Sequence, residues 1–306
     1  MGRKTLNQEV LGDSSGHLKI VECLTCGHIQ LNPPSYSLDY YEEDGQVNAV
    51  IQHYGTPFEK LVEHGLIEAK RRVLRFANHG LDFSKYQSQE PLSVLDVGGG
   101  YGFFASEFKN KNPNSIVTVV EPSKGRVATG KRLLQEKFPD RPLPVFDTSL
   151  IGEKYTEQHR GKYDVITLWH VLEHLTNPCE FLEMLGKLVK PDGGIVCVEV
   201  PNLDDELRNL SKGFNNRWFM AEHVSYFSPH SLRLVANQRS AFTSVNVFGY
   251  QRYGIFNYIN WINQNTPEGA DPDLFDGEDR WWLEKSWRSY RESSLTSDAL
   301  YMVCKK

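Results

Sequence analysis

The sequence lacks any apolar run close to the roughly 20 residues that a membrane-spanning helix needs. Its first residues contain no hydrophobic segment of the kind that a signal peptide carries. Leu6 stands where a myristoylation signal has Ser or Thr. The chain has only five cysteines, an odd and scattered set that does not suit a disulfide scaffold. These absences predict a soluble, cytoplasmic protein without a membrane span.

An excess of positive charge is missing as well. The formal net charge is -5 and the isoelectric point is near 6.1, which argues against a nucleic-acid partner or an anionic membrane surface. The 306 residues are 40% hydrophobic and 24% charged, as in an ordinary globular protein with one large domain or one large and one small domain. The motifs of the chain, rather than its composition, therefore indicate its function.

The most informative motif is the segment 93–102, which reads S-V-L-D-V-G-G-G-Y-G. Its first half is apolar and β-prone and predicts a buried strand. Its second half is rich in glycine, and a helix is predicted to begin at Phe103. In α/β folds, a strand that runs through such a turn into a helix presents backbone N–H groups to a ligand.

The spacing of the glycines distinguishes two ligand classes. A dinucleotide-binding G-x-G-x-x-G motif would need a third glycine at position 103, where the chain has Phe103. The pattern present is acid-x-G-x-G-x-G, and it closely resembles motif I of the class I S-adenosylmethionine-dependent methyltransferases. The resemblance implies that this turn faces the amino-acid end of S-adenosylmethionine and that the acid meets its cationic methionine end. The implied cofactor residues here are Asp96, Gly98, Gly99, Gly100, Tyr101 and Gly102.

Further cofactor residues follow the next strands. The strand predicted at 116–120 ends in Glu121 and Pro122, and one carboxylate can accept hydrogen bonds from both hydroxyls of a ribose. This acid indicates a nucleoside without choosing between a dehydrogenase and a methyltransferase. The strand predicted at 144–146 is followed by Asp147, where similar enzymes place an acid against the adenine amine. Thr148 and Trp169 complete the implied cofactor set.

Short apolar strands alternate with helices of 10–15 residues, for example the helix predicted at 124–137, and this predicts an α/β fold with a doubly wound parallel sheet. The resemblance implies a Rossmann-like sheet of seven strands, with the last strand, 297–304, antiparallel. We expect an N-terminal helical and loop extension with a lid (1–90) and a catalytic domain (91–306). The extension includes a helix at 57–77 and a lid at 36–54; the domain includes an aromatic-rich insertion at 251–296 with an acidic stretch at 268–279.

His170, Glu173 and His174 follow the strand predicted at 163–168, and a single helical turn would put all three on one face. They suit a general base oriented by the carboxylate. They also suit a divalent metal site, since related quinone O-methyltransferases carry E-x-x-E-H as a metal site; two imidazoles and one carboxylate favour Mn, Zn or Fe. A third role is simply to brace the loop.

His223 is a second candidate for the catalytic base. It lies between Trp218 and Tyr226, and a polar group among aromatic side chains is typical of a sugar or small-molecule site. A buried histidine whose ring is hydrogen bonded to the backbone is the alternative.

Cys23 and Cys26 form a C-x-x-C-G sequence like one half of a zinc knuckle. The surrounding segment resembles the N-terminal segment of many sugar-modifying methyltransferases, in which an upstream cysteine pair supplies the other ligands. That pair is absent here, and His17 and His28 have a spacing that fits no common module. We therefore expect a degenerate knuckle of two free thiols on a β-turn, without an essential zinc.

The motifs between residues 92 and about 245 together resemble bacterial methyltransferases of the ubiquinone O-methyltransferase type, especially those acting on sugars or cell-surface glycans. The resemblance implies methyl transfer to a small acceptor, most simply a hydroxyl of a sugar or nucleotide-linked glycan precursor. The alternatives are a non-catalytic nucleoside-binding partner subunit and an N- or C-methyltransferase acting on another metabolite.

Overall fold

The structure is a computed structural model, and it describes residues 2–10, 13, 17–33, 57–79, 91–239, 241–265 and 281–306. The chain divides into two compact units. The first comprises residues 1–36, 170–182 and 198–304, and the second comprises residues 37–169, 183–197 and 305–306. The predicted lid at 36–54 and the acidic stretch at 268–279 lie outside the described residues, and the predicted domain boundary near residue 90 stays a prediction.

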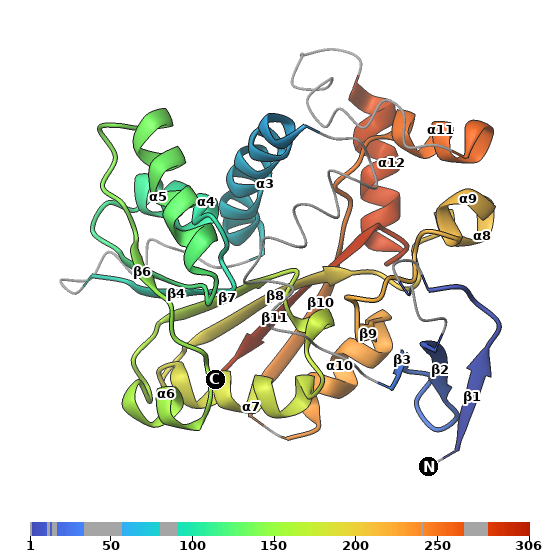
Figure 1. The fold of residues 1–306 in the computed structure, drawn as a ribbon, viewed down its shortest axis with the longest axis horizontal. Helices are drawn as coiled ribbons and strands as arrows, with labels where there is room; N and C mark the ends of the chain where they lie inside the picture. The colour runs from blue at the N-terminus through green and yellow to red at the C-terminus, as the bar shows by residue number, and fades with distance from the viewer. Residues whose placement is uncertain are drawn as a thin grey trace. The chain divides into compact units, whose positions relative to one another are not determined.

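Seven strands are hydrogen bonded in the order β10-β11-β8-β7-β4-β5-β6 (Figure 1). The strand that comes last in the chain, β11, is antiparallel to its neighbours. The prediction of a Rossmann-like, seven-stranded sheet is therefore confirmed. In sheet order, the strands are β10 (Ser244–Tyr250), β11 (Ala299–Lys305), β8 (Ile195–Pro201), β7 (Val165–Trp169), β4 (Ser93–Val97), β5 (Ile116–Val120) and β6 (Val145–Asp147).

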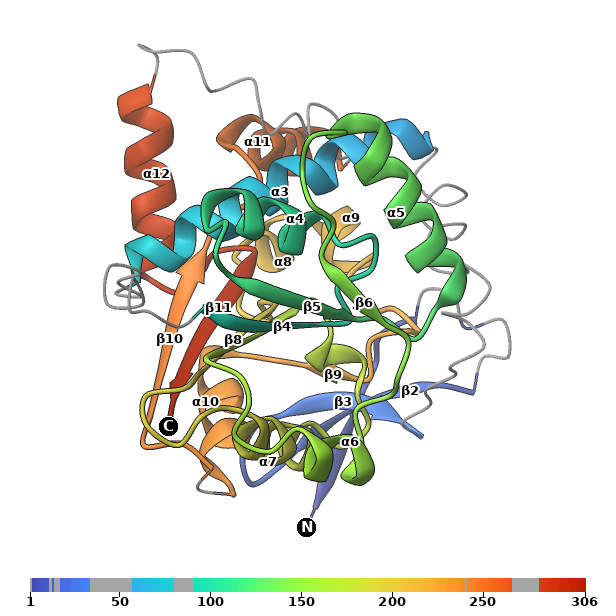
Figure 2. The ribbon, with the colours of Figure 1, turned by 90° about the vertical axis from the view of Figure 1, so that its left-hand side faces the viewer.

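Within the second unit, helices cover both faces of the strands β4, β5 and β6. Figure 2 shows α3 (Phe58–Asn78), α4 (Phe103–Lys111) and α5 (Lys124–Lys137) on one face and α6 (Glu153–Gln158) on the other. The strands β4, β5 and β7 are nearly continuous runs of buried apolar residues, as expected for parallel strands covered on both faces. Parallel pairing brings the carboxyl ends of β4, β5 and β6 to the same edge of the sheet.

An aromatic cluster holds α3 against α4 and β7. The ring of Phe76 lies 5.8 Å from the rings of both Phe104 and Phe108, and all three are buried. Trp169, the last residue of β7, joins the cluster with its ring 4.8 Å from that of Phe104. The cluster explains the apolar face at the C-terminal end of α3.

The N-terminal segment corrects one prediction, because part of the expected helical and loop extension is a β-sheet. In the first unit, β1 (Arg3–Leu6), β2 (Lys19–Cys23) and β3 (Ile29–Asn32) pair in antiparallel order, and β9 (Ser225–Tyr226) joins the edge of β3 (Figure 1). Burial explains the pairing: Ile20 and Leu31 face each other in register and pack with Phe219 and Tyr226. This core joins segments that are far apart in the sequence. The polar composition of residues 1–56 alone therefore did not indicate a sheet.

The remaining elements belong to the first unit, except that α7 begins in the first unit and ends in the second. They are the 3-10 turn η2 (Leu172–His174) and the helices α7 (Pro178–Leu188), α8 (Leu207–Leu210), α9 (Lys212–Asn215), α10 (Pro229–Asn237), α11 (Ile255–Gln264) and α12 (Trp281–Ser293). The described part of the predicted insertion at 251–296 thus contains α11 and α12. The fully buried Arg291 attaches α12 to Asp205 and Glu206 at 2.6 Å each. None of the described helices is long and apolar enough to cross a bilayer.

Candidate functional site

The glycine-rich turn between β4 and α4 has the backbone conformation that its sequence predicts. Gly98, Gly100 and Gly102 have φ angles of 63°, 54° and 76°, a left-handed region that other residues adopt at a cost. A Cβ atom at Gly102 would also lie only 2.7 Å from the ring of Phe146. The turn therefore requires glycine both for its backbone angles and for its close packing.

Glu121 links this turn to the end of β5. One of its carboxylate oxygens accepts a hydrogen bond from the backbone N–H of Gly100 and the other accepts one from that of Ser123, both at 3.0 Å. The side chain is almost fully buried. Because each carboxylate oxygen has two lone pairs, the pair can still accept hydrogen bonds from ligand hydroxyls while it supports the turn.

Asp96 lies directly before the turn, on β4, and is completely buried. Its Oδ1 accepts a hydrogen bond from the hydroxyl of Thr167 at 2.7 Å, whereas its Oδ2 has no hydrogen-bond partner among the described residues. Burial raises the pKa of Asp96 to about 7, although the bond from Thr167 lowers it in part. A buried carboxylate oxygen without a donor favours the approach of a cationic or N–H-bearing group.

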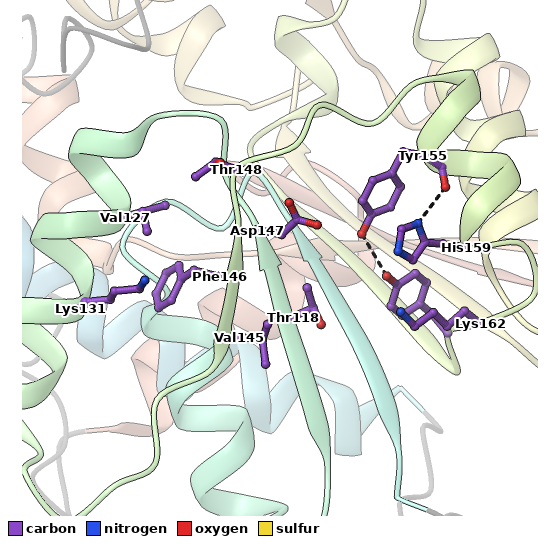
Figure 3. Close-up of a pocket in the computed structure, with 11 residues that line it drawn as sticks. Thr118, Val127, Lys131, Val145, Phe146, Asp147, Thr148, Tyr155, His159 and Lys162 are labelled. Atoms are coloured by element: carbon purple, nitrogen blue, oxygen red, sulfur yellow. Dashed lines mark hydrogen bonds between the residues drawn. The ribbon is translucent and has the colours of Figure 1, made fainter.

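Asp147 and Thr148 line a cavity of about 440 Å³ at the edge of the sheet (Figure 3). Asp147 Oδ1 accepts a hydrogen bond from the backbone N–H of Ser149 at 2.9 Å. The opposite wall holds Tyr155 and Tyr163, whose hydroxyls are 3.0 Å apart. The cavity has the volume of a small-molecule site, but the glycine turn and Glu121 do not line it.

The remaining predicted cofactor residues differ in exposure. Trp169 is buried in the aromatic cluster, where the guanidinium of Arg72 lies 5.0 Å from its ring. Tyr101 and Pro122 are half-buried, and the ring of Tyr101 packs edge-on against that of Phe58. Their assignment to the cofactor stays a prediction.

His170 begins the segment after β7 with an unusual backbone angle, a φ of 55°. Its Nδ1 lies 3.1 Å from Glu173 Oε1, and its Nε2 lies 3.0 Å from Glu199 Oε1. Burial and the nearby Arg252 lower the pKa of His170, but the hydrogen bonds to the two glutamates outweigh them and leave that pKa raised. His170 thus contacts two buried carboxylates: its Nδ1 can donate to Glu173, and its Nε2 lies between Glu199 Oε1, which can only accept, and Arg252 Nη1, which can only donate.

Glu173 is 1% exposed and uses only one of its oxygens in this contact. Its Oε2 has no hydrogen-bond partner among the described residues. Burial would raise the pKa of Glu173, but the hydrogen bond from His170 and the nearby His174 and His223 lower it to about 2. The carboxylate is therefore ionised, with one oxygen left for a ligand.

His174 and His223 meet this carboxylate from two different segments. Ligand-type atoms of Glu173, His174 and His223 all lie within 4.8 Å of one another. His174 Nδ1 is 2.8 Å from the carbonyl of Glu222, which can only accept, so Nδ1 carries the proton and Nε2 has a lone pair in the neutral ring. Burial lowers the pKa of His223 to about 3, which keeps its ring neutral.

The structure therefore regroups the predicted catalytic residues. His170, Glu173 and His174 do not share one face of a helical turn, because only Leu172–His174 form the 3-10 turn and His170 stands outside it. His170 instead orients Glu173, and His223 takes the place beside Glu173 and His174. Glu173, His174 and His223 are thus a cluster of three side chains of the kind that bind metals, and within the described part of the chain no other such cluster is found.

Two charged residues that contact His170 were not predicted from the sequence. Glu199 is fully buried in β8, and Arg252, after β10, has its Nη1 2.8 Å from His170 Nε2. The only sequence signal for Glu199 is an acid within the apolar run 195–200, a pattern that a buried ion pair produces. Arg252 had no such signal.

The strand order of the sheet and the glycine turn after β4 are those of the class I methyltransferase fold. The comparisons with known proteins agree. Residues 67–242, more than half of the chain, match the family model described as a methyltransferase domain. The chain belongs to this methyltransferase-domain family. The prediction of a class I methyltransferase resembling the ubiquinone O-methyltransferase type is confirmed.

The relatives and the solved structures agree on family and fold. The ubiquinone biosynthesis O-methyltransferase of Shewanella halifaxensis is 29% identical over 107 residues, which is 33% of this chain and 40% of that protein. The mitochondrial enzyme of the same name from Dictyostelium discoideum is 28% identical over 112 residues, 35% of this chain and 34% of that protein. The chain thus covers only a third to two fifths of these relatives' length. The magnesium protoporphyrin IX methyltransferase of Synechocystis PCC 6803 with bound SAH has the same fold, with a TM-score of 0.52 and 14% identity over 88% of this chain and 97% of that chain.

Proposed function

We propose that the protein transfers a methyl group from S-adenosylmethionine to a hydroxyl of a small acceptor molecule. The observation that carries the proposal is the glycine turn between two buried carboxylates, Asp96 on β4 and Glu121 after β5. The two relatives named above are O-methyltransferases, which supports an oxygen acceptor over nitrogen or carbon.

Different residues of the second unit would bind different parts of the cofactor. The turn 98–102 would lie against the amino-acid end of the cofactor, with the Oδ2 of Asp96 available to its ammonium group. The N–H groups of Gly98, Gly100 and Gly102 hold the turn itself, because they donate to Val120, Glu121 and Gly99. Glu121 accepts hydrogen bonds from the ribose hydroxyls, and Asp147 accepts one from the adenine amine. When bound, the cofactor supplies a methyl group on a positively charged sulfur, so the reaction needs positioning and a dry site more than covalent help.

The acceptor we propose is a sugar-containing molecule, such as a nucleotide-linked precursor of a cell-surface polysaccharide, methylated in the cytoplasm. Support comes from Trp218, a half-buried aromatic residue close to His223 in the sequence; Tyr226, whose ring lies 6.1 Å from that of His223, is itself packed in the core with Ile20 and Leu31. Such flat apolar faces with a few polar groups suit a sugar ring. The odd, scattered cysteines suit a reducing compartment.

A divalent metal fits the cluster of Glu173, His174 and His223. The donor set is two imidazoles and one ionised carboxylate, which favours Mn, Zn or Fe over Mg or Ca. A metal bound there would supply a positive charge that lowers the pKa of a coordinated acceptor hydroxyl. Without a metal, His174 or His223 would accept the proton of the hydroxyl directly, since both rings have a lone pair in the neutral state.

The test combines cofactor binding with an acceptor screen. Isothermal titration calorimetry is expected to detect binding of S-adenosylhomocysteine and no binding of NAD. The protein is then incubated with labelled S-adenosylmethionine and either nucleotide sugars or hydroxylated aromatic compounds, and products are identified by mass spectrometry. Products methylated on nitrogen or carbon would contradict the proposed oxygen acceptor. Tight NAD binding without any response to S-adenosylhomocysteine would contradict the cofactor itself. Cofactor binding without turnover on any acceptor would favour the non-catalytic partner subunit.

A further inference from the structure

The turn between β2 and β3 holds two cysteines that the methyl-transfer proposal does not use. Cys23 is the last residue of β2, and Cys26 lies in the turn that precedes β3. The turn is closed by two backbone hydrogen bonds, from the N–H of Cys23 to the carbonyl of His28 at 2.9 Å and from the N–H of Gly27 to the carbonyl of Cys23 at 2.8 Å. Both thiols are free and partly exposed. The turn thus presents a dithiol at the end of a hairpin.

The surroundings of the two sulfur atoms differ. Backbone N–H groups of Cys26 and Thr25 donate hydrogen bonds to the sulfur of Cys23, and these bonds lower the pKa of Cys23 to about 7. Burial, by contrast, raises the pKa of Cys26, although a hydrogen bond from the backbone of His28 opposes it. The pKa of each thiol also depends on the other, because their side chains are neighbours in the turn. One sulfur is therefore an accessible nucleophile, and the other is a protonated thiol next to it.

The framework around the turn is held on both sides. β2 pairs with β1 along its length, with Arg3 opposite Cys23, and β3 pairs with β2 and with β9. Gly27 has a φ of 67°, and no atom lies within 4 Å of where its Cβ would be. The strands can therefore stay paired while the turn adjusts to a bond between the two sulfur atoms.

We propose that Cys23 and Cys26 form a thiol–disulfide exchange site that reacts reversibly with small disulfides such as oxidised glutathione. The thiolate of Cys23 attacks one sulfur of the disulfide, forms a mixed disulfide and releases one thiolate. Cys26 then loses its proton and attacks the sulfur of Cys23, which forms the Cys23–Cys26 disulfide and releases the second thiolate. The dithiol is oxidised by two electrons, and the small disulfide is reduced to two thiols.

The other cysteines of the chain provide internal comparisons. Cys197 and Cys304 are fully buried in the sheet. Cys179 is partly exposed, but its thiol donates a hydrogen bond to Gln238 Oε1 at 2.6 Å, and burial raises its pKa. A thiol with a raised pKa is mostly protonated at neutral pH and reacts slowly. Cys179 is therefore the matched control for a partly exposed cysteine outside the turn.

The experiment uses the full chain in buffers of defined ratios of reduced to oxidised glutathione at pH 7. Samples are quenched with acid, free thiols are alkylated, and the peptide that contains both cysteines is analysed by mass spectrometry. We expect a Cys23–Cys26 disulfide that dithiothreitol reverses, and alkylation of Cys23 at least about fivefold faster than that of Cys179. Cys26→Ser should stop at a mixed disulfide with one glutathione on Cys23. Cys23→Ser should lose the fast reaction, and Cys179→Ser should behave like the unchanged protein.

Circular dichroism of each variant checks that the fold is retained. Two results would overturn the proposal. One is that Cys23 reacts no faster than Cys179 and no internal disulfide forms at any glutathione ratio. The other is a stoichiometric zinc ion in the purified protein that protects both thiols from oxidised glutathione until it is removed by a chelator.

Discussion

The imidazole of His170 lies between two buried carboxylates, with Nε2 3.0 Å from Glu199 Oε1 and Nδ1 3.1 Å from Glu173 Oε1. Glu199 is fully buried and Glu173 nearly so. Two such carboxylates would repel each other without a cation between them. His170 therefore provides charge balance and fixes the direction of Glu173, which leaves the other oxygen of Glu173 towards His174 and His223.

Replacing His170 by Ala should lower the free energy of unfolding by about 1.5 to 3 kcal/mol, because it removes the hydrogen-bond partner that Glu173 and Glu199 share while the charge of Arg252 remains. Urea unfolding followed by circular dichroism measures the loss. Arg132→Ala is the matched control, since it breaks an ion pair between two exposed side chains, and it should cost less than about 1 kcal/mol. Equal effects of the two substitutions would contradict the bridging role of His170.

Glu121→Ala should weaken the binding of S-adenosylhomocysteine by about 1.5 to 3 kcal/mol, roughly a 10- to 150-fold rise in Kd. The substitution removes the acceptor proposed for the ribose and the bond that holds the N–H of Gly100. Calorimetry measures the affinity, and Glu136→Ala, which changes an exposed glutamate, serves as the control. An unchanged Kd would remove Glu121 from the cofactor site.

Much of the fold could be predicted because its signals are local. Helix 124–137 coincides with α5 at both ends, and strand 116–120 coincides with β5. Ser228 caps α10, with Pro229 in its first turn, and Ser231 completes a capping box. A buried strand, a turn that needs glycine and a capped helix are each determined by neighbouring residues.

The parts that could not be predicted depend on contacts between distant segments. β2 and β3 are stabilised by Phe219 and Tyr226, almost 200 residues further along the chain, so no local pattern reveals their sheet. In the candidate site, the positive φ of His170 turns its ring towards Glu199 and away from the face of His174. A helical spacing rule assumes a regular helix and cannot anticipate this turn.

Asp96 should make the stability of the protein depend on pH. Its pKa is about 7 in the folded state, above the ordinary value of 3.8, because burial disfavours its charged form. Its contribution to stability is therefore fully present below pH 3.8 and is lost as the pH rises through 7. Between pH 5 and pH 8 the unfolding free energy should fall by about 2 to 3 kcal/mol relative to that of Asp96→Asn. Parallel pH profiles of the two proteins, measured by urea unfolding, would contradict the raised pKa.

Cys23 and Cys26 should hold no zinc that the fold requires, because a structural zinc site needs four ligands and no third ligand atom of the described residues, His28 included, lies within 4.8 Å of both sulfur atoms. Metal analysis of the purified protein should find no zinc bound at this turn. Cys23→Ser should retain the far-ultraviolet circular dichroism spectrum and the urea midpoint of the unchanged protein. Loss of one zinc per chain together with unfolding in that variant would prove the prediction wrong.

Glu173, His174 and His223 should act as one group. His174→Ala and His223→Ala should each lower turnover by about 10²- to 10⁴-fold, the range for a lost acid–base group, with little change in cofactor affinity. His230→Ala, which changes an exposed histidine on α10, should have no effect.

If the cluster holds a metal, prolonged treatment with a chelator should abolish activity and Mn²⁺ should restore it. Mn²⁺ titration followed by electron paramagnetic resonance reports binding independently of turnover, and Glu173→Gln should weaken that binding. Activity that survives chelation, combined with loss of activity in the histidine variants, would assign the base role instead. Full activity in all three variants would leave the cluster with a purely structural role.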